Sequence, residues 1–114
     1  MKKKEIAYVV NTILLNNNEI RNLDDFYFTL STYVLHQPER LQWLNLSYNY
    51  LVKIDAEILE FKQLKSLQLH GNYIADLEEV RKLNELGTLQ SLTLNGNEIE
   101  KIKGYRLYVL GLMF

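Results

Sequence analysis

The sequence predicts an α/β solenoid, in which short parallel strands line a concave face and short helices or turns line the convex face. Three observations lead to this fold class. One apolar pattern occurs four times, an asparagine holds a fixed place in every copy, and the copies follow one another closely. The asparagines Asn18, Asn49, Asn72 and Asn97 are separated by 31, 23 and 25 residues. Intervals of this size are typical of stacked structural repeats.

The clearest copy runs from Leu41 to Leu51, with apolar residues at places one, four, six and eleven and asparagine at place nine. In a strand, places four and six point inward, while places three, five and seven point outward. One such unit cannot bury its apolar face, whereas stacked units share a core. The pattern is that of the leucine-rich repeat and predicts a right-handed solenoid. The other copies have Val10, Ile13, Leu15, Asn18 and Ile20; Leu64, Leu67, Leu69, Asn72 and Ile74; and Leu89, Leu92, Leu94, Asn97 and Ile99.

A chain of 114 residues is long enough for one domain, so residues 1–114 are predicted to form a single repeat domain. Its repeats start near residues 10, 41, 64 and 89. A helical insertion covers 22–37, and a cap-like segment covers 103–114. In that cap, Tyr105, Tyr108, Val109 and Leu112 share one helical face, which suits them to cover the open end of the solenoid.

The insertion is rich in aromatic residues. Leu23, Phe26, Leu30 and Val34 recur every three or four residues, which predicts a helix that Asn22 or Asp24 begins and that ends ahead of Pro38. Phe28 and Tyr33 widen its apolar face. Such a stripe is more often part of a core than an aromatic docking surface, and both readings stay open here.

On the convex side, two aspartates are predicted to begin short helical segments. Asp55 precedes Ile58 and Phe61, and Asp76 precedes a more regular helix. In the second helix, Glu79 has the spacing of a capping box, and Glu78 lies within reach of Lys82. The charges of this helix are expected to form a solvated face.

The asparagine at place nine lies where the chain leaves the strand and bends. Backbone groups buried at this bend need partners, and a side-chain amide supplies both a donor and an acceptor. Asn18, Asn49, Asn72 and Asn97 are therefore predicted to form a buried ladder.

Composition disfavours several classes of function. With 13 basic and 14 acidic residues, the net charge of −1 gives no basis for binding nucleic acid or an anionic membrane. The absence of cysteine favours a reducing compartment. The basic start and the apolar run from Ile6 to Leu15 suggest a secretory signal, but no small-residue cleavage site follows. The run also falls short of the roughly 20 residues that span a bilayer.

No catalytic or cofactor motif is apparent. The two histidines, His36 and His70, lack metal-ligand spacing, and Ser47 and Ser66 lack a glycine-framed nucleophile turn. The sequence therefore predicts no enzyme activity, no metal, no cofactor and no small-molecule substrate.

The outward face of the strands is the candidate binding surface. Among the twenty residues at places two, three, five, seven and eight, only Lys65 is charged. A polar, neutral face with large anchors such as Trp43 suits protein binding, although Trp43 could simply pack along the sheet and His70 could be an ordinary surface residue. The predicted partner-binding residues are Leu14, Asn16, Trp43, Asn45, Tyr48, Gln68, His70, Thr93 and Asn95.

Several segments resemble the leucine-rich repeat-containing protein 51 family. These segments are residues 15–18, 38–47 and 69–72, and the stretch that runs from 91–94 to 103–110. The similarity spans roughly residues 14 to 110. The resemblance implies a cytoplasmic, non-enzymatic protein that binds other proteins, with ciliary association left open. Glu98 stands where the family tends to have proline. The family also continues beyond Phe114 with a further strand and a polar tail, so a truncated chain is one interpretation. A monomer is expected unless exposed Leu112, Met113 and Phe114 promote self-association.

The expected function is that of a protein-interaction scaffold that binds its partner on the concave face. The alternative is a regulatory subunit of a phosphatase or of an axonemal or ciliary complex. Anchors in several successive repeats would favour the alternative, whereas here they are concentrated in one repeat, which favours the scaffold.

Overall fold

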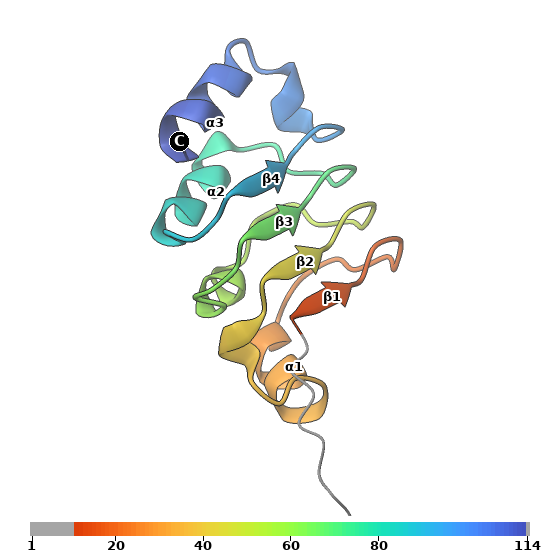
Figure 1. The fold of residues 1–114 in the computed structure, drawn as a ribbon. Helices are drawn as coiled ribbons and strands as arrows, with labels where there is room; N and C mark the ends of the chain where they lie inside the picture. Colours follow the sequence, from red (N-terminus) through yellow and green to blue (C-terminus); the bar gives the residue numbers. More distant parts are fainter. Residues whose placement is uncertain (1–10, 114) are drawn as a thin grey trace, which may run out of the picture.

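The computed structural model describes the backbone of residues 11–113 and the side chains of residues 11–111. Four short strands, β1 (Thr12–Leu14), β2 (Trp43–Asn45), β3 (Ser66–Gln68) and β4 (Ser91–Thr93), form one sheet in the order of the sequence (Figure 1). All three strand pairs are parallel. The predicted α/β solenoid is therefore confirmed. Val10 and Phe114, as well as the start of the apolar run at Ile6, lie outside the described residues.

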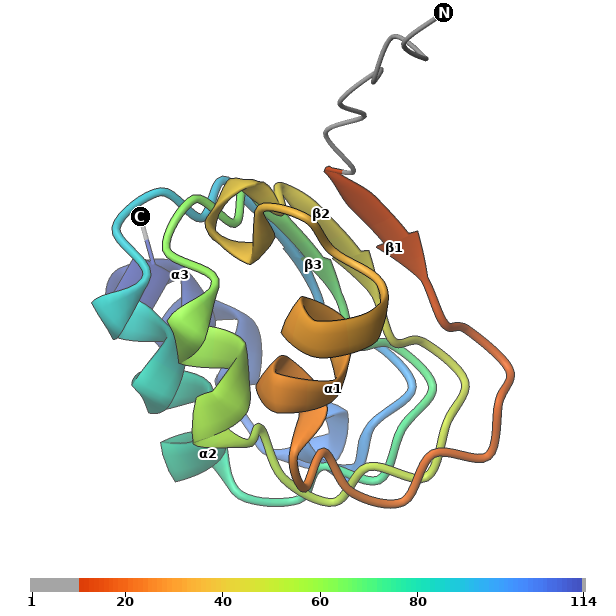
Figure 2. The same ribbon diagram turned by 90° about the horizontal axis from the view of Figure 1, so that it is seen from below.

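Helical segments line the opposite side of the core (Figure 2). The α-helices are α1 (Phe26–Tyr33), α2 (Leu77–Arg81) and α3 (Tyr105–Met113). The 3₁₀ segments are η1 (Pro38–Arg40), η2 (Ala56–Glu60), η3 (Lys82–Glu85) and η4 (Glu98–Lys101).

The core is built from the inward places of the repeats. Leu44, Leu46, Leu67 and Leu69, at places four and six of the two central repeats, are completely buried. In the first repeat, the corresponding Ile13 and Leu15 are only partly buried. Within the described residues, this repeat is stacked on one side only, so its apolar side chains keep some contact with water.

Three of the four ladder asparagines are buried. Asn72 Nδ2 donates to the carbonyl oxygens of Leu46 and Leu69, each at 3.0 Å, and its Oδ1 accepts from Leu51 N at 3.0 Å. Asn49 and Asn97 make the equivalent bonds one repeat before and one repeat after. Each amide thus ties its own turn to the preceding one.

Asn18 departs from the predicted buried ladder. Its side chain is exposed and donates only to the nearby Asn16 carbonyl, at 3.0 Å. Its backbone N–H donates to Asn49 Oδ1 at 2.9 Å. Because no described repeat precedes β1, the Asn18 amide has no earlier turn to join.

The insertion forms a shorter helix than its pattern predicts. Neither Asn22 nor Asp24 begins α1; Asp25 occupies the N-cap with a left-handed φ of 58° and no side-chain cap. Asn22 Oδ1 instead accepts from Asp24 N at 3.1 Å. The helix ends at Tyr33, so Val34 leaves the helical face and is exposed.

The apolar face of α1 also differs from the prediction. Leu23, Leu30 and Leu35 are buried, whereas Phe28 and Tyr33 are 62% and 78% exposed. Phe26 packs against the core as predicted, and Tyr27, which the pattern did not include, packs there as well. Their rings lie 6.0 and 5.1 Å from the ring of Phe61.

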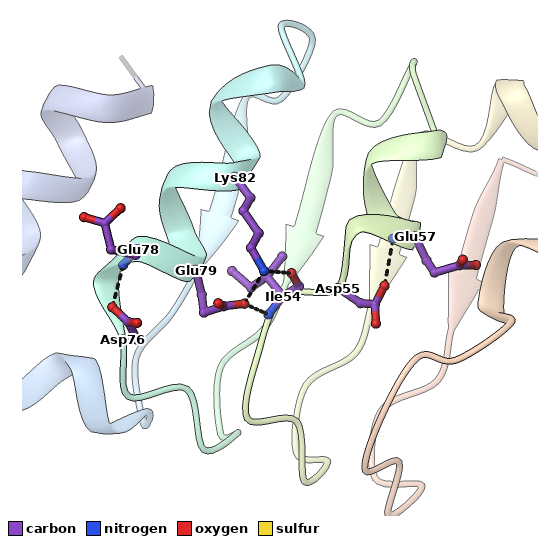
Figure 3. A network of polar contacts seen from close by, with 7 residues as sticks. All are labelled: Ile54, Asp55, Glu57, Asp76, Glu78, Glu79 and Lys82. Carbon is purple, nitrogen blue, oxygen red and sulfur yellow. Dashed lines mark hydrogen bonds and ion pairs between the residues drawn. The ribbon is translucent and has the colours of Figure 1, made fainter.

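Asp55 and Asp76 begin their helical segments as predicted. Their carboxylates accept from Glu57 N at 3.0 Å and from Glu78 N at 2.9 Å (Figure 3). C-terminal to the fourth strand, Tyr105 and Val109 of α3 pack against the core and Tyr108 is half-buried. The Leu112 side chain lies outside the described residues.

The predicted capping box at Glu79 and the Glu78–Lys82 pair are wrong. Glu79 Oε1 accepts from Lys82 Nζ at 2.8 Å and from Ile54 N at 2.9 Å, and Lys82 Nζ also donates to Ile54 O at 3.3 Å (Figure 3). Glu79 lies in α2 and Lys82 is the first residue of η3, so the two side chains are three residues apart and neighbours on one helical face. Glu57 likewise accepts from Tyr27 N at 2.7 Å. These convex carboxylates therefore join repeats, rather than forming only a solvated face.

The ladder makes a prediction with its own control. Asn72→Ala should lower the free energy of unfolding by about 1–3 kcal/mol, because it leaves the buried Leu51 N–H without a partner and removes one of the two amide donors from the carbonyl oxygens of Leu46 and Leu69. Asn18→Ala, at the exposed end of the same series, should lower it by less than about 0.5 kcal/mol. Urea denaturation measures both. Equal losses for the two variants would contradict the role given to the buried amides.

Candidate binding face

The strand register brings the candidate residues together in rows across one face. Trp43 pairs with Thr12 on one side and Ser66 on the other, and Asn45 lies between Leu14 and Gln68 in the next row. The pairing continues beyond the strands, where Tyr48 N donates to His70 O and Gly71 N donates to Asn95 O, each at 2.9 Å. The structure therefore places the nine predicted residues along a single sheet surface. They are Leu14, Asn16, Trp43, Asn45, Tyr48, Gln68, His70, Thr93 and Asn95.

Trp43 is the large side chain of the first row. It is 48% exposed, and its row is otherwise made of the small residues Thr12, Ser66 and Ser91. A hollow of about 430 Å³ crosses the starts of all four strands beside it. Its lining is Asn11, Thr12, Gln42, Trp43, Lys65, Ser66, Gln90 and Ser91.

The second row consists mainly of side chains that hydrogen-bond. Asn45 Oδ1 accepts from Ser47 N at 3.0 Å and Ser47 Oγ at 2.6 Å, and Gln68 Nε2 donates to Ser66 Oγ at 2.5 Å. Ser47 and Ser66 are consequently buried, although their outward places suggest contact residues. Within the described chain, Gln68 Oε1 is buried without a hydrogen-bond partner. The half-exposed Asn45 amide remains for a ligand.

Aromatic and polar side chains are linked across three repeats where the strands end. The Tyr48 and His70 rings meet edge to face, with centroids 5.1 Å apart, and His70 Nδ1 lies 2.7 Å from Thr93 Oγ1. Tyr48 is 56% exposed, whereas His70 and Thr93 are half-buried. His70 is thus a support for Tyr48 as well as part of the surface. Asn95 is exposed and Asn16 half-buried at the two ends of this region.

The backbone of Tyr48 is strained. Place eight is left-handed in every repeat, with φ of 61° at Asn17, 55° at Tyr48, 73° at Gly71 and 74° at Gly96. Glycine and asparagine adopt this conformation readily, whereas another side chain raises the free energy by about 1–2 kcal/mol. Strain of this kind, beneath an exposed aromatic ring, is more typical of a functional residue than of a structural one.

Gly71 lets the Tyr48 ring lie across the sheet. A Cβ at Gly71 would be only 2.5 Å from Tyr48 Cδ1, so any larger residue would displace the ring. Sequence reasoning missed this arrangement, although the asparagine and glycines at place eight were a usable signal for the left-handed conformation.

A second exposed aromatic group lies outside the predicted face. The rings of Tyr50 and Tyr73, at place ten of successive repeats, are stacked with centroids 5.8 Å apart. The Arg21 guanidinium lies 5.1 Å from the Tyr50 centroid. Tyrosine at the same place in two successive repeats is the sequence signal for this stack. The stacked rings and the Arg21 guanidinium together form an exposed cation–π group in the turns that follow the strands.

The described residues offer surfaces for contact more than groups for chemistry. Between residues 11 and 113, no three His, Cys, Asp or Glu side chains gather where they could hold a metal ion. Over the same range, no helix is long and apolar enough to cross a membrane. Lys65 is the one charged residue among the described outward places, and it is exposed.

Comparison with known proteins defines the class. The leucine-rich repeat family model matches residues 8–113, so the chain belongs to the leucine-rich repeat family. It is similar to leucine-rich repeat-containing protein 51 from Bos taurus, with 48% identity over 102 residues, covering 90% of this chain and 53% of that protein. The Homo sapiens protein of the same name is 46% identical over 109 residues, covering 96% and 56%. The resemblance noted in the sequence is confirmed, and the chain spans about half the length of these relatives.

More distant comparisons agree on the fold. The U2 small nuclear ribonucleoprotein A′ of Arabidopsis thaliana is 35% identical over 101 residues, covering 88% of this chain and 37% of that protein. The solved Drosophila melanogaster SNF/U2A′ complex contains a chain that superposes with a TM-score of 0.69 at 22% identity, covering 90% and 67%. The chain therefore shares its repeat fold with these proteins.

The packing of Tyr48 on Gly71 can be tested by denaturation. Gly71→Ala should lower the free energy of unfolding by more than Gly104→Ala does, because Gly104 has a similar φ of 81° but no atom within 4 Å of its Cβ position. The left-handed backbone alone accounts for about 1–2 kcal/mol in each variant. The additional loss of stability in Gly71→Ala, beyond that in Gly104→Ala, comes from the clash with the Tyr48 ring. This additional loss should disappear when Tyr48 is replaced by Asn. An excess that persists without the ring would show that the two residues are not coupled.

Proposed function

We propose that this chain is a non-enzymatic interaction scaffold that binds a protein partner on its concave face. The observation that carries the proposal is Tyr48, whose ring is held exposed at a left-handed backbone position that asparagine or glycine would occupy without strain. Gly71 and His70 hold that ring from below and from the side. A fixed aromatic side chain loses little conformational freedom on binding, so it contributes strongly to an interface.

The rest of the face supports this function. Trp43 gives a second exposed aromatic anchor at the other end of β2. The outward side chains between them are neutral hydrogen-bonding groups, which are less costly to desolvate than charges. A cytoplasmic site of action belongs to the same proposal.

Affinity capture with matched variants tests the face. Trp43→Ala and Tyr48→Asn should each weaken capture of specific protein partners at least tenfold, as expected for interface anchors. Phe28→Ala is the control, because Phe28 is also a large exposed aromatic residue but lies on α1. Quantitative mass spectrometry of the captured proteins measures the effect.

Two checks make the outcome decisive. Tyr48→Asn should leave the free energy of unfolding unchanged or raise it by up to about 1 kcal/mol, because it relieves the strain at place eight. Lost binding would then not reflect lost folding. Partners that survive both concave variants and are lost with Phe28→Ala would overturn the proposal and move the site to the insertion helix.

A further inference from the structure

The starts of the strands form a positively charged edge beside Trp43. The hollow of about 430 Å³ there is lined by one charged residue, Lys65. A neighbouring hollow of about 420 Å³ shares Asn11 and Gln42 with it and is lined by Arg40. Both cations are exposed, and within the described residues neither forms an ion pair. Since no described acidic residue lines either hollow, the two cations are free to meet carboxylates of a partner.

The direction of the hollow suits a helix lying across the strands. It takes two lining residues from each of the four repeats, so it spans three strand spacings, or roughly 14 Å. An α-helix covers that distance with about nine or ten residues.

The sheet gives an extended chain no backbone partners on this face. β2 and β3 are each paired on both sides, so their N–H and C=O groups are already bonded within the sheet. A helix satisfies its own backbone, whereas an extended peptide would bring unpaired N–H and C=O groups onto a surface of side chains. The small residues Thr12, Ser66 and Ser91 leave room around Trp43 for such a helix.

We propose that the hollow at the strand starts receives an acidic, amphipathic α-helix of a protein partner, with one large apolar residue against Trp43 and carboxylates facing Lys65 and Arg40. This inference rests on the proposed function and specifies its partner. Lys65 belongs to the repeat after that of Trp43, about 4.8 Å further along the solenoid. The carboxylate should therefore lie three or four residues from the apolar anchor, because those spacings recur on one helix face.

Selection from two displayed peptide libraries provides the probe. One library carries randomised residues on a helical alanine and glutamine frame, and the other is proline-rich and extended; both exclude tryptophan. Trp43 is the only tryptophan of the chain, so a blue shift of its emission reports burial at this site. The helical library should yield binders with Asp or Glu three or four residues from a large apolar residue.

Charge reversal then tests the role of the two cations. Arg40→Glu with Lys65→Glu should weaken the selected acidic helices about tenfold and should select Lys or Arg at the same positions. Lys53→Glu is the control for general electrostatics, because Lys53 is exposed and lines neither hollow. It should change affinity by less than about twofold.

Each result separates this inference from the proposed function. Binders that depend on Trp43 but are extended, or that keep the same charges after reversal, would overturn the acidic helix and leave the concave scaffold intact. If peptides of both libraries bind equally well to Trp43→Ala, both the inference and the concave site are wrong.

Discussion

The structure depends on a bond that each repeat makes to the one before it through the asparagine at place nine. Asn49, Asn72 and Asn97 are buried, and each amide joins backbone groups of two successive turns. The inward leucines supply most of the burial, but they do not fix how one turn sits on the next. The directional bonds do, and the convex contacts of Glu57 and Glu79 add to them on the opposite side.

This stacking also determines what the concave face can present. Once the turns are in register, side chains at the same place of successive repeats lie in rows. A large side chain in a row of small ones is then exposed above its neighbours. Trp43 is the large side chain of the row at place three, and Tyr48 is the large side chain of the row at place eight. Both belong to the second repeat, so the two anchors lie near the ends of one strand. The proposed binding surface thus follows from two exceptions to an otherwise regular pattern.

The sequence predicted the periodic part of the molecule and missed much of what breaks the period. Strand places and two aspartate caps could be read from residue type because they recur or act locally. The exposed Asn18, the short α1 and the contact of Glu79 with Ile54 depend on which neighbour is present, which no single repeat encodes. On the candidate face, outward direction was readable from strand alternation, but the burial of Ser47 and Ser66 was not. Their hydroxyls hydrogen-bond with Asn45 and Gln68, each two residues away along the chain.

Site-specific photo-crosslinking tests the central claim most directly, because it reports which face touches a partner. The chain would carry p-benzoylphenylalanine in place of Trp43 in one sample and in place of Phe28 in another, both of which are large exposed aromatic positions. The concave-face account predicts a specific crosslinked protein from the Trp43 position and none of that protein from the Phe28 position. The same protein crosslinked from Phe28 alone would contradict it.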